Sequence, residues 1–288
     1  MKRKSVIPMN VPQEIFKSAE GHQAILDFYD QILQKWPVPY TTSFLSTRHG
    51  ETFVIACGDE SFPALILLHG SSSNSASWMG DVVQLSSRYR VFAVDMPGEP
   101  GKSEPIRRTL DGPAYTEWME DIFSALNLNT SGLVGISLGA WLALKYAVSH
   151  PDKVSTLVLL CPSGIAPQKR SFLPRVVLLM LLGSWGRKRV MQIINGNAVL
   201  PQEVLDFLTL VGSNFNPRVA VMPLFSDEEL RRLNMPVLMI GGAEDALLPS
   251  SKTAARLKRL APHATTEVLP NTGHVLTGLT DKIVAFLN

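Results

Sequence analysis

Short apolar runs recur along this chain, and longer stretches with polar positions separate them. The runs are continuous rather than alternating, which is typical of strands buried on both faces of a parallel sheet. They occupy residues 64–68, 91–94, 133–136, 157–160 and 237–240. Apolar positions at helical spacing lie between them, at 114–126 and at 138–148. This alternation predicts an α/β fold with a mostly parallel, doubly wound sheet.

Both ends of the chain add elements to this pattern. Residues 14–36 carry apolar side chains at helical spacing up to Pro37, which predicts an N-terminal amphipathic helix. The stretches 42–47 and 52–57 are strand-like and are joined through His49 and Gly50, which indicates a hairpin. Near the other end, residues 265–269 predict the last strand.

One interval, from residue 161 to 236, is too long for a simple crossover. A structureless loop of that length is unusual in a compact domain, so we expect a helical insertion, the cap, at 165–235. The predicted organisation is an N-terminal extension at 1–40, a core at 41–164 and 236–288, and the cap between the two core segments. The apolar run at 176–182 favours a cap helix packed on the core, with an apolar wall for a substrate as the alternative.

Composition narrows the classes of protein. Hydrophobic residues make up 45% of the chain and the net charge is only +2, so we expect a sizeable core and no nucleic-acid partner that needs a large positive charge. The two cysteines, Cys57 and Cys161, are too few for a disulfide framework or a Cys-rich zinc site. The basic N-terminus is followed by prolines rather than by the apolar stretch of a signal peptide. We expect a cytoplasmic protein without stable membrane association, and the oligomeric state stays open.

The candidate nucleophile is Ser137. It is the centre of Gly135-Ile136-Ser137-Leu138-Gly139, a G-x-S-x-G pattern between a buried strand and a helical stretch. A strand-to-helix turn that exposes a serine forces unusual backbone angles on it and crowds the flanking positions, which glycine relieves. The following helix places its N-terminal N–H groups beside developing negative charge.

A serine hydroxyl needs a base, and His274 is the candidate among six histidines. It follows the 265–269 strand, at the carboxyl edge where α/β sheets gather their sites. His69 is the alternative base, although shaping the loop after the 64–68 strand is the role that we favour for it. The remaining four lie in the N-terminal helix, in the hairpin turn, at a helix end and after a basic helix: His22, His49, His150 and His263.

A carboxylate should orient the imidazole and stabilise its cation. Glu244 and Asp245 both follow the 237–240 strand. Asp95, at the end of the 91–94 strand, is the competing acid, but its neighbourhood reads as a structural turn. Acyl transfer also needs N–H donors for an oxyanion. We expect these donors at Leu138 and Ser71, with Ser72 as the alternative to Ser71.

Together these motifs resemble the α/β-hydrolase superfamily, from about residue 40 to the end apart from the cap. The motifs are His69-Gly70, Asp95-Met-Pro-Gly-x-x-Gly-x-Ser103, Gly135-x-Ser137-x-Gly139, Gly242-x-x-Asp245-x-x-x-Pro249 and Gly273-His274. The resemblance selects Asp245 over Glu244 as the acid, and the order Ser137, Asp245, His274 is that of the superfamily. The pair Glu99-Pro100 departs from the common pattern by lengthening its loop.

The chain is further similar to bacterial carboxylesterases of the type called carboxylesterase NP, which hydrolyse esters of arylpropionic acids. This resemblance implies a serine carboxylesterase that works through an acyl-enzyme on small-molecule esters, with no metal and no organic cofactor. It implies that the cap closes over Ser137. Trp78, Trp141 and Phe215 are possible substrate contacts, although a position in the core is the role that we favour for each. Carbon–carbon bond hydrolases, cofactor-free perhydrolases, lipases and a non-catalytic binding protein of the same fold stay as alternatives.

Overall fold

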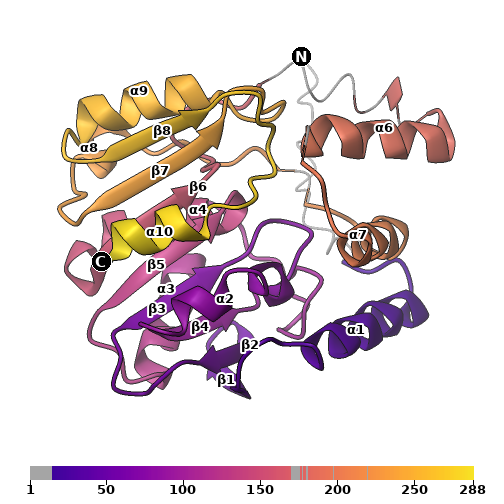
Figure 1. Ribbon diagram of the computed structural model, residues 1–288, viewed down its shortest axis with the longest axis horizontal. Helices are drawn as coiled ribbons and strands as arrows, with labels where there is room; N and C mark the ends of the chain where they lie inside the picture. Colours follow the sequence, from indigo (N-terminus) through magenta and orange to yellow (C-terminus); the bar gives the residue numbers. More distant parts are fainter. Residues whose placement is uncertain (1–14, 170–175, 177, 180, 197, 219) are drawn as a thin grey trace, which may run out of the picture.

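One eight-stranded sheet organises the molecule (Figure 1). The computed structural model describes residues 15–169, 176, 178–179, 181–196, 198–218 and 220–288. The strands are β1 (Tyr40–Thr47), β2 (Gly50–Cys57), β3 (Ala64–Leu68), β4 (Arg90–Val94), β5 (Ser131–Ile136), β6 (Val154–Leu160), β7 (Val237–Gly242) and β8 (Thr265–Leu269). Their spatial order is β1-β2-β4-β3-β5-β6-β7-β8. The pairs β1–β2 and β2–β4 are antiparallel and all the others are parallel, so the predicted fold class is confirmed.

Helices cover both faces of this sheet, which explains why its strands are continuously apolar. Ile66 and Leu68 of β3 point into one core with α3 (Ala114–Ala125), α4 (Leu138–Ser149) and α9 (Ser250–Leu260). Leu65 and Leu67 point into the other core with α1 (Ala19–Leu33), α2 (Val82–Leu85) and α10 (Thr280–Leu287). All four leucine and isoleucine side chains have no exposed surface. Short 3₁₀ turns, η1 (Ser75–Trp78) and η2 (Pro151–Lys153), connect the layers.

The N-terminal helix is shorter than the predicted 14–36. Ser18 caps it by accepting the N–H of Gly21, so α1 begins at Ala19. Phe16 precedes the cap and forms an isolated β-bridge with Phe215 instead. Helix α1 lies beside α7 (Gln202–Asn214), as Figure 1 shows.

Between β6 and β7 the chain forms α6 (Gly183–Asn195), α7 and α8 (Asp227–Leu230). Within the described part of the 176–182 run, three leucines are mostly exposed: Leu178, Leu181 and Leu182. The expected packing of this stripe on the core is therefore wrong for these three side chains, whereas residues 177 and 180 lie outside the described residues. At the far end of the interval, Phe225 and Leu230 pack into the main core. The cap boundaries at 165–235 stay a prediction.

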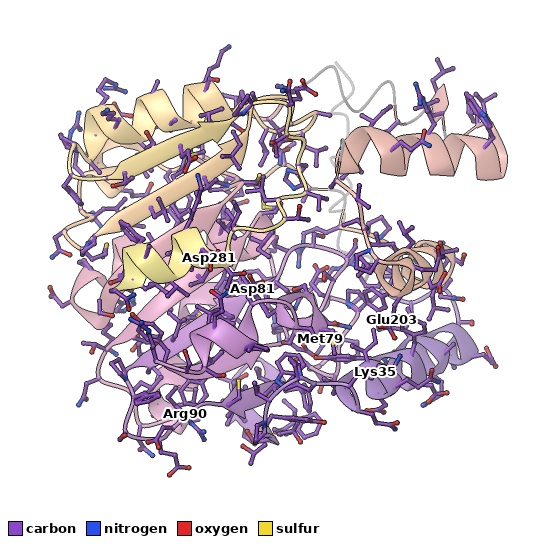
Figure 2. The ribbon with its side chains drawn as sticks, viewed as in Figure 1. Lys35, Met79, Asp81, Arg90, Glu203 and Asp281 are labelled. Carbon is purple, nitrogen blue, oxygen red and sulfur yellow. The ribbon has the colours of Figure 1, made fainter. Side chains whose placement is uncertain are left out.

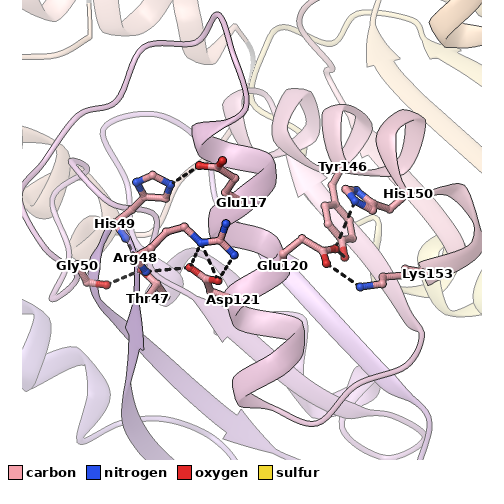
Figure 3. Close-up of polar contacts among 10 residues, drawn as sticks. All are labelled: Thr47, Arg48, His49, Gly50, Glu117, Glu120, Asp121, Tyr146, His150 and Lys153. Atoms are coloured by element: carbon pink, nitrogen blue, oxygen red, sulfur yellow. Dashed lines mark hydrogen bonds and ion pairs between the residues drawn. The ribbon is translucent and has the colours of Figure 1, made fainter.

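Ion pairs bind the surface elements together. Lys35 Nζ lies 2.7 Å from Glu203 Oε1 and links the end of α1 to α7 (Figure 2). Another ion pair holds helix α3 (Figure 3). Arg48 of the β1–β2 turn donates to Asp121 of this helix, with a shortest distance of 2.7 Å. Within the described residues, no helix is long and apolar enough to cross a membrane.

Two glycines let α4 start directly against the sheet. A Cβ on Gly139 would lie 2.3 Å from the carbonyl oxygen of Leu68 and 2.5 Å from that of His69. A Cβ on Gly135 would lie 2.5 Å from the backbone nitrogen of Ala140. These neighbours are backbone atoms, which cannot rotate away, so only glycine permits the close approach.

Gly139→Ala should lower the free energy of unfolding by about 3 kcal/mol or more, because α4 must move away from β3. Urea denaturation followed by circular dichroism measures this change. Gly212 is the matched control, since it is exposed in α7 and has no atom within 4 Å of an added Cβ. Gly212→Ala should stabilise the protein by up to about 1 kcal/mol. Equal stability of the two variants would contradict the packing argument.

Asp121→Asn should lower Tm at pH 7 by about 1–3 °C. Burial alone would raise the pKa of Asp121, but hydrogen bonds and charge from Arg48 outweigh it and lower that pKa. A lowered folded-state pKa gives stability above the unfolded value of about 3.9, and this stability is lost as the pH falls through the folded pKa. The difference in Tm should therefore vanish in acid. A gap that persists below the folded-state pKa would refute the ion-pair explanation.

Candidate active site

The turn between β5 and α4 presents Ser137 at the carboxyl edge of the sheet. Its φ of 52° and ψ of −104° lie in a region that non-glycine residues rarely adopt. The surrounding structure holds this conformation, because the Ser137 N–H donates to the carbonyl of Leu160 on β6 at 2.8 Å. The Ser137 carbonyl accepts the N–H of Trp141 at 2.9 Å and so begins α4.

His274 lies between Ser137 and Asp245. Its Nδ1 is 2.7 Å from Asp245 Oδ2, and its Nε2 is 3.1 Å from Ser137 Oγ. An ionised carboxylate only accepts hydrogen bonds, so Nδ1 carries the proton and donates it to Asp245. In the neutral ring Nε2 is then an acceptor, oriented to receive the hydroxyl proton of Ser137. The structure thus brings together the three side chains that the sequence selected.

Asp245 is fully buried, yet its environment favours the charged form. Burial by itself would raise the pKa of Asp245. The hydrogen bond and charge of His274 outweigh burial and hold that pKa below its ordinary value. Two backbone N–H groups add to this effect: those of Leu247 and Leu248 donate to Oδ1 at 2.8 and 2.9 Å. Each oxygen of the carboxylate is therefore engaged, which fixes the plane of the acid beside the imidazole.

The amide donors predicted for an oxyanion lie next to Ser137. Leu138 is the first residue of α4, and the first N–H groups of a helix have no partner within it. The loop after β3 also approaches closely, since a Cβ on Gly70 would lie 4.0 Å from the Cβ of Ser137. The N–H of Ser72 is committed elsewhere, because it donates to Glu99 Oε2 at 2.7 Å. Among the described residues, the N–H of Ser71 has no backbone or side-chain acceptor.

His69 and Asp95, the alternative base and acid, are occupied by other contacts. The His69 Nδ1–H donates to the Gly70 carbonyl at 2.8 Å, and Nε2 accepts the N–H of Met96 at 2.9 Å. Burial lowers the pKa of His69, so the ring stays neutral. The Asp95 carboxylate accepts from the hydroxyl of Tyr29 and from two backbone N–H groups, those of Ser75 and Lys102. Both side chains shape the loops around Ser137.

Sequence reasoning missed two residues that contact the acid and base. The Cys161 thiol, just after β6, donates to the His274 carbonyl at 3.3 Å, and Lys169 Nζ donates to the Asp245 carbonyl at 2.5 Å. The sequence offers one signal for Cys161, which is its position directly after a predicted strand. Both hydrogen bonds join residues that are far apart in the sequence, so local pattern does not reveal them.

Cys161, Asp245 and His274 place one potential metal-ligating atom each within 4.8 Å of the others. Asp245 and His274 already bond each other through these atoms. Burial, followed by the charge of Asp245, raises the pKa of Cys161 well above its usual range. Without a metal ion, the thiol is therefore protonated and serves as a hydrogen-bond donor.

The three aromatic residues predicted as substrate contacts are almost completely buried. Trp78, Trp141 and Phe215 each expose 1% of their surface. Trp141 Nε1 donates to the carbonyl of Pro223 at 3.1 Å, which fixes its ring inside the main core. Such positions are typical of core side chains. Their contact with a substrate stays a prediction.

A hollow of about 510 Å³ lies where α6 meets the loop after β7. Its lining residues are Arg189, Gln192, Ile193, Gly196, Glu244 and Ala246. Glu244 and Ala246 flank Asp245, and the carbonyl of Ile194 at the end of α6 accepts the N–H of His274 at 3.2 Å. Helix α6 therefore borders the base and acid directly.

Related proteins are found by comparison of the sequence. Residues 65–285 match the alpha/beta hydrolase family. Carboxylesterase YbfK of Bacillus subtilis (strain 168) is 31% identical over 272 residues, which cover 91% of this chain and 91% of that protein. An uncharacterized carboxylesterase, nap, of the same organism is 31% identical over 278 residues, which cover 90% and 91%.

The similarity extends to solved structures. The crystal structure of naproxen esterase (carboxylesterase NP) from Bacillus subtilis matches with a TM-score of 0.82 and 28% identity, covering 94% of this chain and 100% of that one. The predicted resemblance to this type of carboxylesterase is confirmed. Because the family match spans most of the sequence and the two relatives are covered nearly in full, the chain belongs to the alpha/beta hydrolase family.

Proposed function

We propose that the protein is a serine carboxylesterase that hydrolyses small-molecule esters through an acyl-enzyme. The observation that carries this proposal is the hydrogen-bonded series from Asp245 Oδ2 through His274 to Ser137 Oγ, with distances of 2.7 and 3.1 Å. Each member has the chemistry that its position needs: a buried charged acid, a histidine with its proton on Nδ1, and a serine hydroxyl. The names of the carboxylesterase relatives support the choice of ester over other acyl compounds.

In the first half of the reaction, Ser137 Oγ attacks the ester carbonyl while its proton passes to His274 Nε2. The imidazolium that forms lies against the Asp245 carboxylate, whose charge stabilises it. The carbonyl oxygen becomes an oxyanion and receives hydrogen bonds from the N–H groups of Leu138 and Ser71. Collapse of the tetrahedral intermediate expels the alcohol, which takes the proton from His274.

In the second half, a water molecule replaces the alcohol. His274 Nε2 accepts a proton from this water, and the resulting hydroxide attacks the acyl carbon on Ser137. The same two amides stabilise the second oxyanion. Ser137 then leaves with the proton from His274, which releases the carboxylic acid and restores the starting state. Every proton in this cycle moves between the substrate, water and two side chains that are 3.1 Å apart.

We place the acyl or alcohol group of the substrate in the hollow between α6 and the loop after β7. Helix α6 belongs to the proposed cap at 165–235. The volume of the hollow, about 510 Å³, lies in the range of small-molecule sites. Two observations support this placement: the lining residues Glu244 and Ala246 flank Asp245, and the carbonyl of Ile194 accepts the backbone N–H of His274. Ile193 supplies an apolar wall.

Ser137→Ala and His274→Ala should each lower kcat for p-nitrophenyl butyrate by about 10⁴-fold or more, because one removes the nucleophile and the other its base. Far-ultraviolet circular dichroism should stay unchanged. A fluorophosphonate should label Ser137 in the wild type and fail to label the Ala variant. His263→Ala is the matched control, since its Nε2 lies 3.0 Å from the Met235 carbonyl and contacts no member of the proposed triad.

Near-normal turnover by Ser137→Ala would refute the esterase mechanism. Wild-type protein that cleaves no ester but is labelled at Ser137 would favour another serine-dependent reaction of the same fold, such as carbon–carbon bond hydrolysis. Absence of both turnover and labelling would favour a binding protein.

Ile193→Trp should narrow the hollow and lower kcat/KM for p-nitrophenyl octanoate about tenfold or more relative to the acetate ester. Val204→Trp is the control, because Val204 is exposed on α7 and does not line the hollow. The rate of fluorophosphonate labelling should be the same in both variants. An unchanged ratio of octanoate to acetate would place the substrate elsewhere.

A further inference from the structure

Glu99 is a buried carboxylate beneath the loop that carries the proposed oxyanion amide. It exposes only 2% of its surface. Its Oε2 accepts the N–H of Ser72 at 2.7 Å and lies 3.4 Å from the hydroxyl of Ser71. Glu99 belongs to the loop after β4, whereas both serines belong to the loop after β3. The contact therefore ties together two loops at the carboxyl edge of the sheet.

The hydrogen bond falls on a strained residue. Ser72 has a φ of 59°, in the left-handed region that non-glycine residues seldom occupy without support. A bond from a backbone N–H to a carboxylate is among the stronger hydrogen bonds in proteins. Glu99 thus supplies an interaction that can hold Ser72 in this conformation.

Fixing Ser72 also fixes the neighbouring amide. The carbonyl of Ser71 and the N–H of Ser72 belong to one planar peptide unit. When the N–H of Ser72 is bonded to Glu99, the plane of that unit is set, and only the φ and ψ of Ser71 separate it from the Ser71 N–H. The direction of the Ser71 N–H, the proposed oxyanion donor, therefore depends on the contact between Ser72 and Glu99.

The backbone of Glu99 is held by hydrogen bonds on both sides. Its N–H donates to the carbonyl of Met96 at 3.3 Å, and its carbonyl accepts the N–H of Gly101 at 2.8 Å. Burial raises the pKa of Glu99, and the hydrogen bond from Ser72 and the charges of Arg107 and Arg218 oppose that rise. Glu99 belongs to the pair Glu99-Pro100 by which the loop departs from the pattern common in the superfamily.

We propose that Glu99 is a positioning residue that sets the oxyanion-binding loop by holding the N–H of Ser72 and thereby orienting the N–H of Ser71. This inference rests on the proposed esterase function. Glu99 does not touch the substrate and transfers no proton. Its effect should appear in transition-state stabilisation rather than in substrate affinity.

The test compares Glu99→Ala with Glu99→Gln in the full-length protein. Glu99→Ala should lower kcat for p-nitrophenyl butyrate about 10–100-fold with KM changed less than about threefold, because a misaligned donor is a smaller loss than a deleted one. Glu99→Gln should keep kcat within about threefold of wild type, because its amide oxygen still accepts the N–H of Ser72. Active sites are counted by fluorophosphonate labelling, so that unfolded protein does not enter kcat.

Two further variants separate positioning from general stability. Glu104→Ala removes another carboxylate from the same segment and should leave kcat unchanged. Among the described residues, the hydrogen bonds of Glu104 are made by its backbone, to Glu51, Gly98 and Ile106. In the Glu99→Ala background, Ser72→Gly should recover at least part of kcat, because glycine adopts a positive φ without strain. If Glu99→Ala fails to fold, Glu99→Gln and Ser72→Gly/Glu99→Gln decide the question: both should retain wild-type kcat.

Wild-type kcat in Glu99→Ala would overturn the inference, and so would an equal loss in the Ala and Gln variants. A merely structural role would lower Tm and the number of labelled sites while leaving kcat per labelled site unchanged. If wild type and Ser137→Ala turn over the ester at the same rate, it is the esterase proposal that fails, whatever the Glu99 variants do.

Discussion

The strained backbone of Ser137 is the constraint on which the rest of the site depends. A φ of 52° at a serine is unfavourable by itself, so the fold must supply the compensation. Part of it is the hydrogen bond from Ser137 to Leu160 on the adjacent strand, and part is the packing of α4, whose residues are nearly all buried. Gly135 and Gly139 permit that packing by leaving room for backbone atoms. The packing of the core therefore maintains the strained backbone conformation of Ser137.

The parallel sheet converts positions that are far apart in the sequence into neighbours. Strands β3 to β8 run in one direction, so the residues that follow them gather at one edge. Ser137 follows β5, Asp245 follows β7 and His274 follows β8. The loops after β3 and β4 contribute Ser71 and Glu99. A short loop is enough to carry each of these residues, because the parallel strands bring the loops to the same edge of the sheet.

This geometry explains how much of the site could be predicted. Ser137 and His274 were accessible from the sequence because each follows a predicted strand, and the ends of strands are visible as a local pattern. The choice of Asp245 over Glu244 needed the family resemblance, since both acids follow the same strand. In the structure Glu244 donates its backbone N–H to the carbonyl of Thr272 and lines the hollow, whereas Asp245 contacts His274. The local sequence does not show which of the two acids contacts the histidine.

The unpredicted features are contacts between distant loops or exposures that pattern cannot reveal. The bond from Ser72 to Glu99 joins residues 27 positions apart, and it engages the N–H of Ser72, the alternative donor to that of Ser71. The leucines of the 176–182 run look like a core stripe, but Leu178 and Leu181 are 65% and 78% exposed. Hydrophobicity shows that a side chain can be buried, whereas burial also requires a surface to pack against.

Two buried carboxylates near Ser137 have opposite environments, and the difference follows from where charge develops. Asp245 accepts three hydrogen bonds beside an imidazole that becomes cationic, and its pKa is lowered. Glu99 contacts the loop that carries the proposed oxyanion amide, and burial raises its pKa despite the nearby charges of Arg107 and Arg218. A full negative charge there would oppose an oxyanion, whereas beside His274 it assists the cation. An acceptor under the oxyanion loop is therefore useful for its geometry, and the arginines limit the electrostatic cost of placing a carboxylate there.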